Sequence, residues 1–458
     1  MIDLVGNAQV SSAQSVLRTR RLFRLITSGT QSRFICQQNI LKPGYIAQMG
    51  VVIASGVTSV NAISGGGAAA KDHGLETVGT TCSISKPSKL IMYARRVQVV
   101  SPRSQLVLSA KMSTKGAEDF PSSLLDKFKT RFGFKQSTGV SVKKEDLEDE
   151  IRKENAISKE IENEVRSGSL TVDTAEDDEE IVSVTRDEIN PGLIWERREK
   201  DVKAEERRPQ LTSPGFSFSA AGLLFPYHLG VCECLMEHGY LTENTPLAGS
   251  SAGALVCAVV ASGLKMSDAL LATKALAKDC RENGTAFRLG AVLRVYLESS
   301  LPDDAHVRTS GRIRVAITQV FRQPRGLLVD QFDSKEDLIN ALHTSCFIPG
   351  YLAPRPVTVF RNRICVDGGI TLFMPPTAAE KTVKVCAFSA AAWGIKGIEI
   401  SPDHNPKMFK VSNRQLLNWA LEPAEDEILD GLYEMGYEDA LVWVRRERQG
   451  LGASSIES

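Results

Sequence analysis

From residue 211 onward, short apolar segments alternate with longer segments that have helical periodicity. The segments expected to form strands are 216–220, 246–249, 312–318 and 363–366. The segments expected to form helices are 225–238, 252–262 and 334–345. Strands that alternate with helices are typical of an α/β fold with a largely parallel sheet. We therefore predict an α/β domain over residues 211–400 and a helical extension over 401–458, interrupted at Pro423.

The region before this domain has a different pattern. Residues 141–210 contain 22 acidic and 13 basic side chains, so half of the positions are charged. A thin apolar stripe at roughly helical spacing is formed by Leu147, Ile151, Ile157, Ile161 and Val165. We expect a charged helical linker region over 116–210, in which the stripe lies on a solvated helix. An arm that binds a partner protein is the alternative.

A basic amphipathic segment, SSLLDKFKTRFGFK, precedes the charged stretch. Its apolar side chains, Phe128 among them, stand beside lysines and arginines such as Lys127 and Arg131. Such a helix can lie on a membrane surface. It can also pack as a short helix on the main domain, and the pattern alone leaves both possibilities open.

The first 115 residues contain 14 lysines and arginines but only three acidic residues, Asp3, Asp72 and Glu76. An acid-poor stretch that contains arginine and serine is typical of an organelle transit peptide. A disordered tail without targeting function is the alternative for residues 1–115. If residues 1–115 are a transit peptide, the length of this region and its many small uncharged residues favour a chloroplast or other plastid over a mitochondrion as the destination. Residues 43–70 carry no charge but are too rich in polar and small residues to predict a membrane span.

Composition excludes several other classes. The chain has 55 basic and 55 acidic residues, so its balance implies no nucleic-acid partner. Nine cysteines occur without a C-x-x-C pair, and the six histidines lack metal-ligand spacing. We expect free thiols in a reducing compartment, no metal site and no cofactor.

The segment PLAGSSAGALVCAVV contains the candidate nucleophile. Gly249, Ser251 and Gly253 match G-x-S-x-G, the pattern of a sharp strand-to-helix turn that presents a reactive serine. The first and last positions are small because the helix folds back closely over the strand. A plain turn would fit the five residues as well, so the surrounding sequence must decide.

Two further segments supply what an acyl-transfer site needs. The small-residue turn SAAGLL, residues 219–224, offers backbone N–H groups for an oxyanion. Asp367 ends a strand and is followed by Gly368 and Gly369, which suits a carboxylate exposed at the sheet edge. The alternative is an α/β-hydrolase triad, in which a histidine follows the acidic residue. His404 is the only histidine after Asp367, and it lies in a polar turn. In addition, about one strand precedes the Gly249–Gly253 turn, whereas several precede it in an α/β-hydrolase. We therefore expect a Ser–Asp dyad.

Four ordered segments carry a family resemblance: FSFSAAGLLFPYHLGVCECL, AGSSAGAL, FDSKEDLINALHTSCFIPGY and CVDGG. Together they resemble the patatin-like phospholipase domain, in the branch of adipose triglyceride lipase and adiponutrin and as a plant-type organellar member. The resemblance covers about 216–400 and, more weakly, 434–441. It implies a three-layer fold with a central, mostly parallel sheet. It also implies hydrolysis of lipid acyl esters, with Ser251 as nucleophile and Asp367 as base, and contact with a membrane or lipid-droplet surface.

One stretch departs from the family pattern. Where the family has G-x-G-x-x-G, residues 220–225 read AAGLLF, so only the middle glycine remains. We expect the N–H groups of Ala221, Gly222 and Ala252 to form the oxyanion hole. Alanine can serve there if its φ is negative, whereas a positive φ would be costly. A weakly active lipid-binding or scaffold protein, and a soluble esterase for small esters, are therefore the competing functions.

Overall fold

The computed structural model describes residues 122–132, 142–167, 181–186, 192–207, 211–321, 323–390, 394–404 and 411–454. The expected transit peptide, residues 1–115, lies outside the described residues. All described residues belong to one compact unit. Among them, no helix combines the length and the apolar composition that crossing a membrane requires.

A nine-stranded sheet forms the centre of the domain, and its strands run in the order β1-β2-β6-β5-β4-β3-β9, with β8 paired to β5 and β7 to β8. The strands are β1 (Ile181–Arg186), β2 (Leu193–Arg198), β3 (Gly215–Phe218), β4 (Leu247–Ser250), β5 (Ile313–Phe321), β6 (Gln323–Val329), β7 (Thr358–Phe360), β8 (Arg363–Asp367) and β9 (Thr382–Val385). Neighbours along β9, β3, β4 and β5 are parallel, as predicted.

The remaining strands differ from the predicted parallel arrangement. Strands β6 and β8 both pair with β5 in the antiparallel sense, and β1 and β2 extend the sheet beyond β6. Two strands therefore lie within the region predicted to be a helical linker. Leu193 and Ile194 of β2 are buried, so this region contributes to the core.

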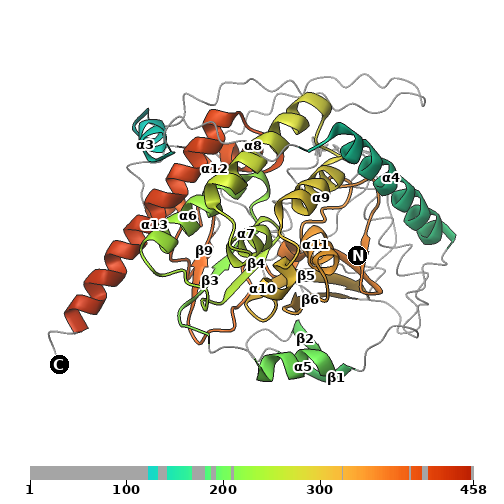
Figure 1. Cartoon of the computed structure of the whole chain (residues 1–458), viewed down its shortest axis with the longest axis horizontal. Helices are drawn as coiled ribbons and strands as arrows, with labels where there is room; N and C mark the ends of the chain where they lie inside the picture. The colour runs from blue at the N-terminus through green and yellow to red at the C-terminus, as the bar shows by residue number, and fades with distance from the viewer. Residues whose placement is uncertain are drawn as a thin grey trace, which may run out of the picture. The chain divides into compact units, whose positions relative to one another are not determined.

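Helices surround the sheet (Figure 1). They are α3 (Ser122–Phe132), α4 (Lys144–Ser167), α5 (Glu199–Glu206), α6 (Phe225–Glu237), α7 (Ala252–Ala261), α8 (Met266–Asn283), α9 (Leu289–Ser300), α10 (Ala305–Thr309), α11 (Lys335–Ser345), α12 (Asn413–Leu421) and α13 (Asp426–Ser454). The α/β prediction and the helical C-terminal region are confirmed. Helix α11 begins as expected, because the Ser334 hydroxyl accepts a hydrogen bond from the Asp337 N–H at 3.0 Å.

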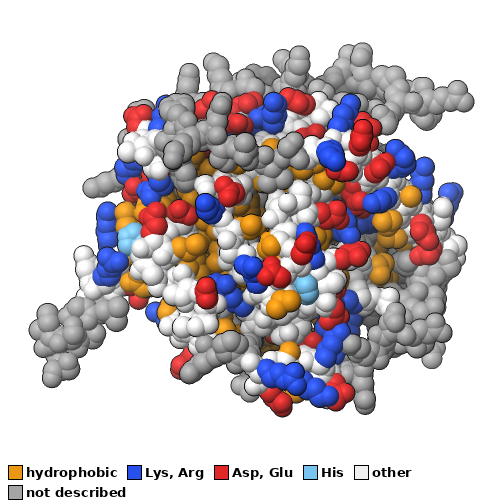
Figure 2. Space-filling view, in the orientation of Figure 1, with side chains coloured by type: hydrophobic (Ala, Val, Ile, Leu, Met, Phe, Trp, Pro, Cys, Tyr) orange, Lys and Arg blue, Asp and Glu red, His pale blue; other side chains and the backbone are white. Residues whose placement is uncertain are grey.

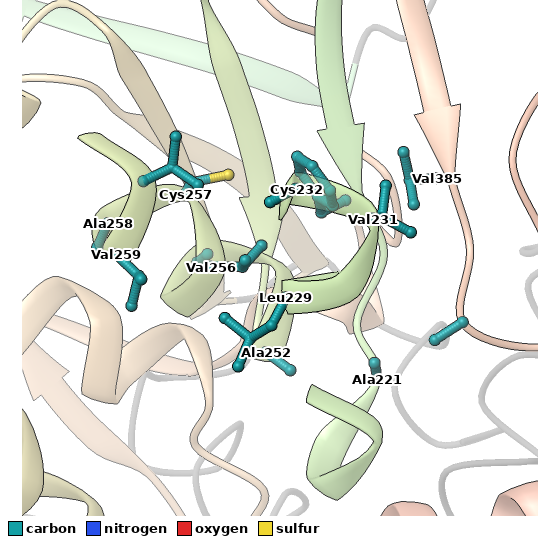
Figure 3. Close-up of a cluster of buried hydrophobic side chains, with 14 of the residues drawn as sticks. Ala221, Leu229, Val231, Cys232, Ala252, Val256, Cys257, Ala258, Val259 and Val385 are labelled. Atoms are coloured by element: carbon teal, nitrogen blue, oxygen red, sulfur yellow. The ribbon is translucent and has the colours of Figure 1, made fainter. Parts of the chain in front are cut away.

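The core lies between the sheet and the helices. Leu229 and Cys232 of α6 and Val256 of α7 belong to one continuous buried cluster (Figure 3). At the surface, acidic and basic side chains of the described residues are interspersed on the face that Figure 2 shows. The mixture agrees with the balanced net charge of the whole chain.

The C-terminal region is part of this domain. Helix α13 packs along α6 (Figure 1), and glycines allow the close approach. A Cβ on Gly230 would lie 1.8 Å from the Tyr433 carbonyl oxygen, and one on Gly436 would lie 2.0 Å from the Tyr227 carbonyl oxygen. Large apolar side chains of this region are buried: Trp419, Ile428, Leu432 and Trp443.

Helix α3 packs on α13. Lys127 pairs with Glu438, and the Arg131 Nε lies 3.3 Å from Glu434 Oε2. Its Phe128 ring meets Tyr433 edge to face at 6.1 Å. Of the two readings of this basic amphipathic segment, these contacts favour a helix that packs on the main domain.

Helix α4 is not solvated all round, contrary to the expectation. Leu147 lies in a buried cluster with residues of α9, and α4 packs along that helix. Glu150 and Glu154 are buried on the same face. Glu150 pairs with Arg294 at 3.2 Å and Glu154 pairs with Arg355 at 2.6 Å. Some charged side chains of α4 thus hold the helix on the domain through buried ion pairs, while others face the solvent.

The Glu154–Arg355 pair should be important for stability. Glu154→Gln leaves the buried Arg355 guanidinium without its counter-charge, and the positive charge of Arg294 acts on the same group. We expect the free energy of unfolding to fall by about 3–5 kcal/mol. Denaturant titration measures this change. Glu162→Gln, at an exposed position of α4, should change it by less than about 0.5 kcal/mol, and equal effects of the two variants would contradict the prediction.

Candidate active site

Ser251 occupies the sharp turn between β4 and α7. Its backbone has φ 52° and ψ −125°, a conformation that costs a non-glycine residue about 1–3 kcal/mol. The two motif glycines make this turn possible. A Cβ on Gly249 would lie 2.2 Å from the Gly253 carbonyl carbon, and one on Gly253 would lie 2.2 Å from the Phe218 carbonyl oxygen. The geometry is therefore that of a nucleophile elbow rather than a plain turn.

Asp367 ends β8 and is buried, with 5% of its surface exposed. Its Oδ1 accepts a hydrogen bond from the Gly369 N–H at 2.7 Å, whereas within the described part of the chain no donor has hydrogen-bond geometry to the buried Oδ2. Burial raises the pKa of this carboxyl to about 7, and the Ser251 side chain and the Gly369 N–H oppose the rise. A carboxylate with a pKa near neutrality is suited to accept a proton.

The sheet brings the two residues together in a way that the sequence did not predict. Strand β6 occupies one edge of β5, and β4 and then β8 pair with successive parts of its other edge, so Ser250 lies opposite Ala316 and Asp367 lies opposite the next residue, Ile317. Because β8 is antiparallel to β5, its end meets the middle of β5 at the level of the elbow. A Cβ on Gly368 would lie 2.0 Å from the Ala316 carbonyl oxygen, so glycine is needed after Asp367.

The turn predicted to form the oxyanion hole is compatible with alanine. Ala221 has φ −146°, so its side chain imposes no strain, and only Gly222 has a positive φ, 55°. A Cβ on Gly222 would lie 2.2 Å from the Ala420 carbonyl oxygen of α12. The one glycine retained from the family pattern is therefore the one that the backbone requires.

The candidate oxyanion donors lie on adjacent segments. The short 3₁₀ helix that begins at Gly222 contacts α7, and Ala252 is the first residue of α7 (Figure 3). The N–H of a first helical residue has no partner within its helix. No backbone acceptor among the described residues is paired with the N–H of Ala221 or Ala252. These two groups are therefore free to donate to a bound oxyanion.

The described histidines have hydrogen-bond partners other than this pair or are not bonded to it. His228 is fully buried and bonds through Nε2 to the Ser219 carbonyl oxygen at 3.0 Å, and burial lowers its pKa to about 4. Within the described residues, no hydrogen bond joins His228, His343 or His404 to Ser251 or Asp367. The arrangement is that of a Ser–Asp pair without a histidine base.

Sequence reasoning recognised the segment that lies against both residues and expected Phe347 and Ile348 to line an apolar cleft beside Asp367, but it missed Ser345 and Cys346. Cys346 is buried, and its thiol interacts with the Ser251 side chain and with the Asp367 carboxyl. The neighbouring Ser345 and Phe347 hydrogen-bond to the backbones of the same two residues. The signal available was the Phe-Ile-Pro part of the family resemblance, which assigns no role to Ser345 or Cys346. The seven described cysteines are all free and buried, in agreement with the expectation.

Comparison with known proteins agrees with this geometry. Residues 216–379 match the family described as "Patatin-like phospholipase". Patatin-like phospholipase domain-containing protein 4 from Homo sapiens is 30% identical over 251 residues, covering 50% of this chain and 96% of that protein. This chain belongs to the patatin-like phospholipase family.

Other relatives are longer. Patatin-like phospholipase domain-containing protein 2 from Rattus norvegicus is 32% identical over 253 residues, with 52% of each chain covered. The Homo sapiens protein named 1-acylglycerol-3-phosphate O-acyltransferase PNPLA3 is 31% identical over 258 residues, with 52% of this chain and 53% of that protein covered. The chain thus spans about half the length of these curated relatives.

The Asp367 carboxyl should set the pH dependence of Ser251 reactivity. Only the ionised carboxylate can accept the serine proton, so the rate at which a fluorophosphonate labels Ser251 should rise with pH through about 7. Asp367→Asn should lower this rate by about 10²–10⁴-fold at pH 8. His404→Ala should remain within about tenfold of the unmodified protein. A triad would replace the dyad if His404→Ala were as slow as Asp367→Asn.

Proposed function

We propose that this protein is a serine hydrolase that releases fatty acids from membrane or storage lipids. The observation that carries the proposal is the strained Ser251 at the start of α7, beside a buried carboxyl whose pKa is raised to about 7. Membership of the family supports lipid esters as substrates.

The reaction has two steps. Ser251 Oγ attacks the carbonyl carbon of the ester while Asp367 takes the hydroxyl proton, and the oxyanion accepts hydrogen bonds from the N–H groups of Ala221, Gly222 and Ala252. Collapse of this intermediate expels the alcohol, which receives the proton from Asp367, and leaves an acyl-enzyme. Asp367 then takes a proton from water as the hydroxide formed attacks the acyl carbonyl carbon. When this second intermediate collapses, the fatty acid is released and Ser251 Oγ leaves with the proton returned by Asp367, which regenerates both residues.

The surroundings of the pair suit an acyl chain. Cys346 and Phe347 belong to a buried apolar cluster, and Leu223 and Leu255 pack against it. Leu223 lies within the oxyanion turn and Leu255 lies in the first turn of α7, so this cluster includes side chains from both segments that supply the candidate oxyanion donors. Transferring an acyl chain into such surroundings is favourable by about 0.8 kcal/mol per buried CH₂ group.

A weakly active lipid-binding or scaffold protein is the alternative. The altered oxyanion stretch and the long charged arm are the features that favour it. The negative φ of Ala221 removes the first reason, and the packing of α4 on α9 gives part of the charged arm a structural role. Ser251 and Asp367 are both present. A hydrolase is therefore the better-supported function.

Ser251→Ala should abolish hydrolysis without unfolding the protein. It removes the proposed nucleophile, a loss that costs on the order of 10⁶-fold in turnover. The matched control is Ser250→Ala, which removes the hydroxyl that donates to the Phe373 carbonyl oxygen at 2.8 Å and should keep turnover within about tenfold. Lipid analysis after incubation with mixed organelle lipids measures the released fatty acids. Release that persists in Ser251→Ala would contradict the assignment, and activity confined to short, monomeric esters would favour a soluble esterase.

We also propose import into plastids and peripheral contact with a membrane or lipid-droplet surface. The acid-poor composition of residues 1–115 supports the first proposal, and the family supports the second. A fluorescent reporter fused to residues 1–115 should enter plastids, as fluorescence microscopy in plant cells can establish. A control that replaces Arg18, Arg20, Arg21 and Arg24 with glutamate should remain in the cytosol. Entry into mitochondria, or cytosolic retention of the unmodified fusion, would contradict plastid import.

A further inference from the structure

Three consecutive residues at the end of α11 contact both members of the Ser–Asp pair. The Ser251 N–H donates to the Ser345 hydroxyl at 2.8 Å. The Asp367 N–H donates to the Phe347 carbonyl oxygen at 2.8 Å. Between them, Cys346 is buried, and the pKa of its thiol is raised by burial and by the Asp367 charge and lowered by the Ser251 side chain. One short segment is thus connected to the backbone of the nucleophile and to the backbone of the base.

The Ser345 hydroxyl makes two hydrogen bonds. It accepts from the Ser251 N–H and donates to the Ala316 carbonyl oxygen of β5 at 2.7 Å. Ser345 and Ala316 are fully buried, so water cannot replace either bond. The hydroxyl therefore connects the elbow to β5, the strand that also pairs with β8 and so carries Asp367.

Ser251 needs such a connection because of its backbone. The sheet pairing of β4 ends at Ser250, and the first N–H groups of α7 lack partners within the helix. The hydroxyl of Ser345 is thus the acceptor that the Ser251 N–H finds while φ is held at 52°. Without it, this buried N–H would have no partner, and the turn could relax and carry Oγ away from Asp367.

We propose that Ser345 is a positioning residue, which holds the strained Ser251 backbone against β5 and so sets the distance between the nucleophile and its base. The proposal rests on the proposed function in assigning Ser251 and Asp367 their roles. It assigns Ser345 no contact with substrate. It also implies that the Ser251 N–H does not donate to the oxyanion, which leaves that task to the N–H groups of Ala221, Gly222 and Ala252.

The test compares four variants of the full chain by the rate of fluorophosphonate labelling of Ser251. Ser345→Ala and Ser345→Cys remove or weaken the hydrogen bonds at nearly constant size, and both should label about 10–100-fold more slowly, since a displacement of about 1 Å can cost that much. Ser345→Thr keeps the hydroxyl and should restore the rate to within about tenfold. The control is Ser217→Ala, which also removes a fully buried hydroxyl, one that donates to the Pro375 carbonyl oxygen at 2.6 Å.

Two further readouts separate positioning from general stability. The interaction with Ser251 lowers the pKa of Asp367, so displacement of Ser251 should raise the pH midpoint of labelling in Ser345→Ala but not in Ser217→Ala. With a hydrolysable ester, kcat should fall in Ser345→Ala while KM stays within about threefold. Thermal unfolding shows whether each variant is folded at the assay temperature.

The outcomes are distinct. Folded Ser345→Ala or Ser345→Cys that label at the unmodified rate would overturn the proposal, as would an equal loss in Ser217→Ala. If Ser345→Ala does not fold, the rates of Ser345→Cys and Ser345→Thr decide the question. Labelling of the unmodified protein without any lipid hydrolysis would overturn the proposed function and leave the positioning role supported. Absence of labelling in the unmodified protein would overturn both.

Discussion

The positive φ of Ser251 is the constraint on which the rest of the structure depends. It requires that α7 fold back over β4, and this return leaves room only for hydrogen at Gly249 and Gly253. The second of these glycines lies against the Phe218 carbonyl oxygen at the end of β3, just before the oxyanion turn. The elbow therefore fixes the spacing between the nucleophile and the strand that leads into the candidate oxyanion hole.

The sequence predicted those parts of the site that depend on neighbouring residues. The elbow, the glycines around it and the end of β8 at Asp367 could all be recognised from local pattern, because turns and strand ends have local signatures. The antiparallel direction of β8 could not, since a short apolar strand pairs equally well in either sense. The Ser345 contact joins residues 94 positions apart, and nothing in the periodicity of α11 indicates it. Membrane contact and plastid import stay predictions.

The domain that supports the candidate site extends beyond the residue 211–400 boundaries predicted from composition and pattern. Residues 401–458 were predicted to be an extension, yet α12 brings the Ala420 carbonyl oxygen against Gly222 and α13 packs closely on α6. The charged α4 was expected to be solvated, yet its Leu147 joins the apolar cluster that contains Phe347. Composition could not reveal these contacts, because a charged helix with a thin apolar stripe packs through a few residues only. The candidate site is thus supported by segments from both sides of the family match.

Because Asp367 is buried, its ionisation has opposite effects on catalysis and on stability: it allows the carboxylate to activate Ser251, and it lowers the free energy of unfolding. In the unfolded chain this carboxyl ionises near its ordinary pKa of 3.8, whereas in the folded protein it holds its proton up to about pH 7. The folded state therefore binds more protons between these values, and its stability declines as the pH rises through this interval. The difference corresponds to an upper limit on the order of 4 kcal/mol. The ionised form that can activate Ser251 is thus the less stable form of the protein, and its stability must come from the packing elsewhere in the domain.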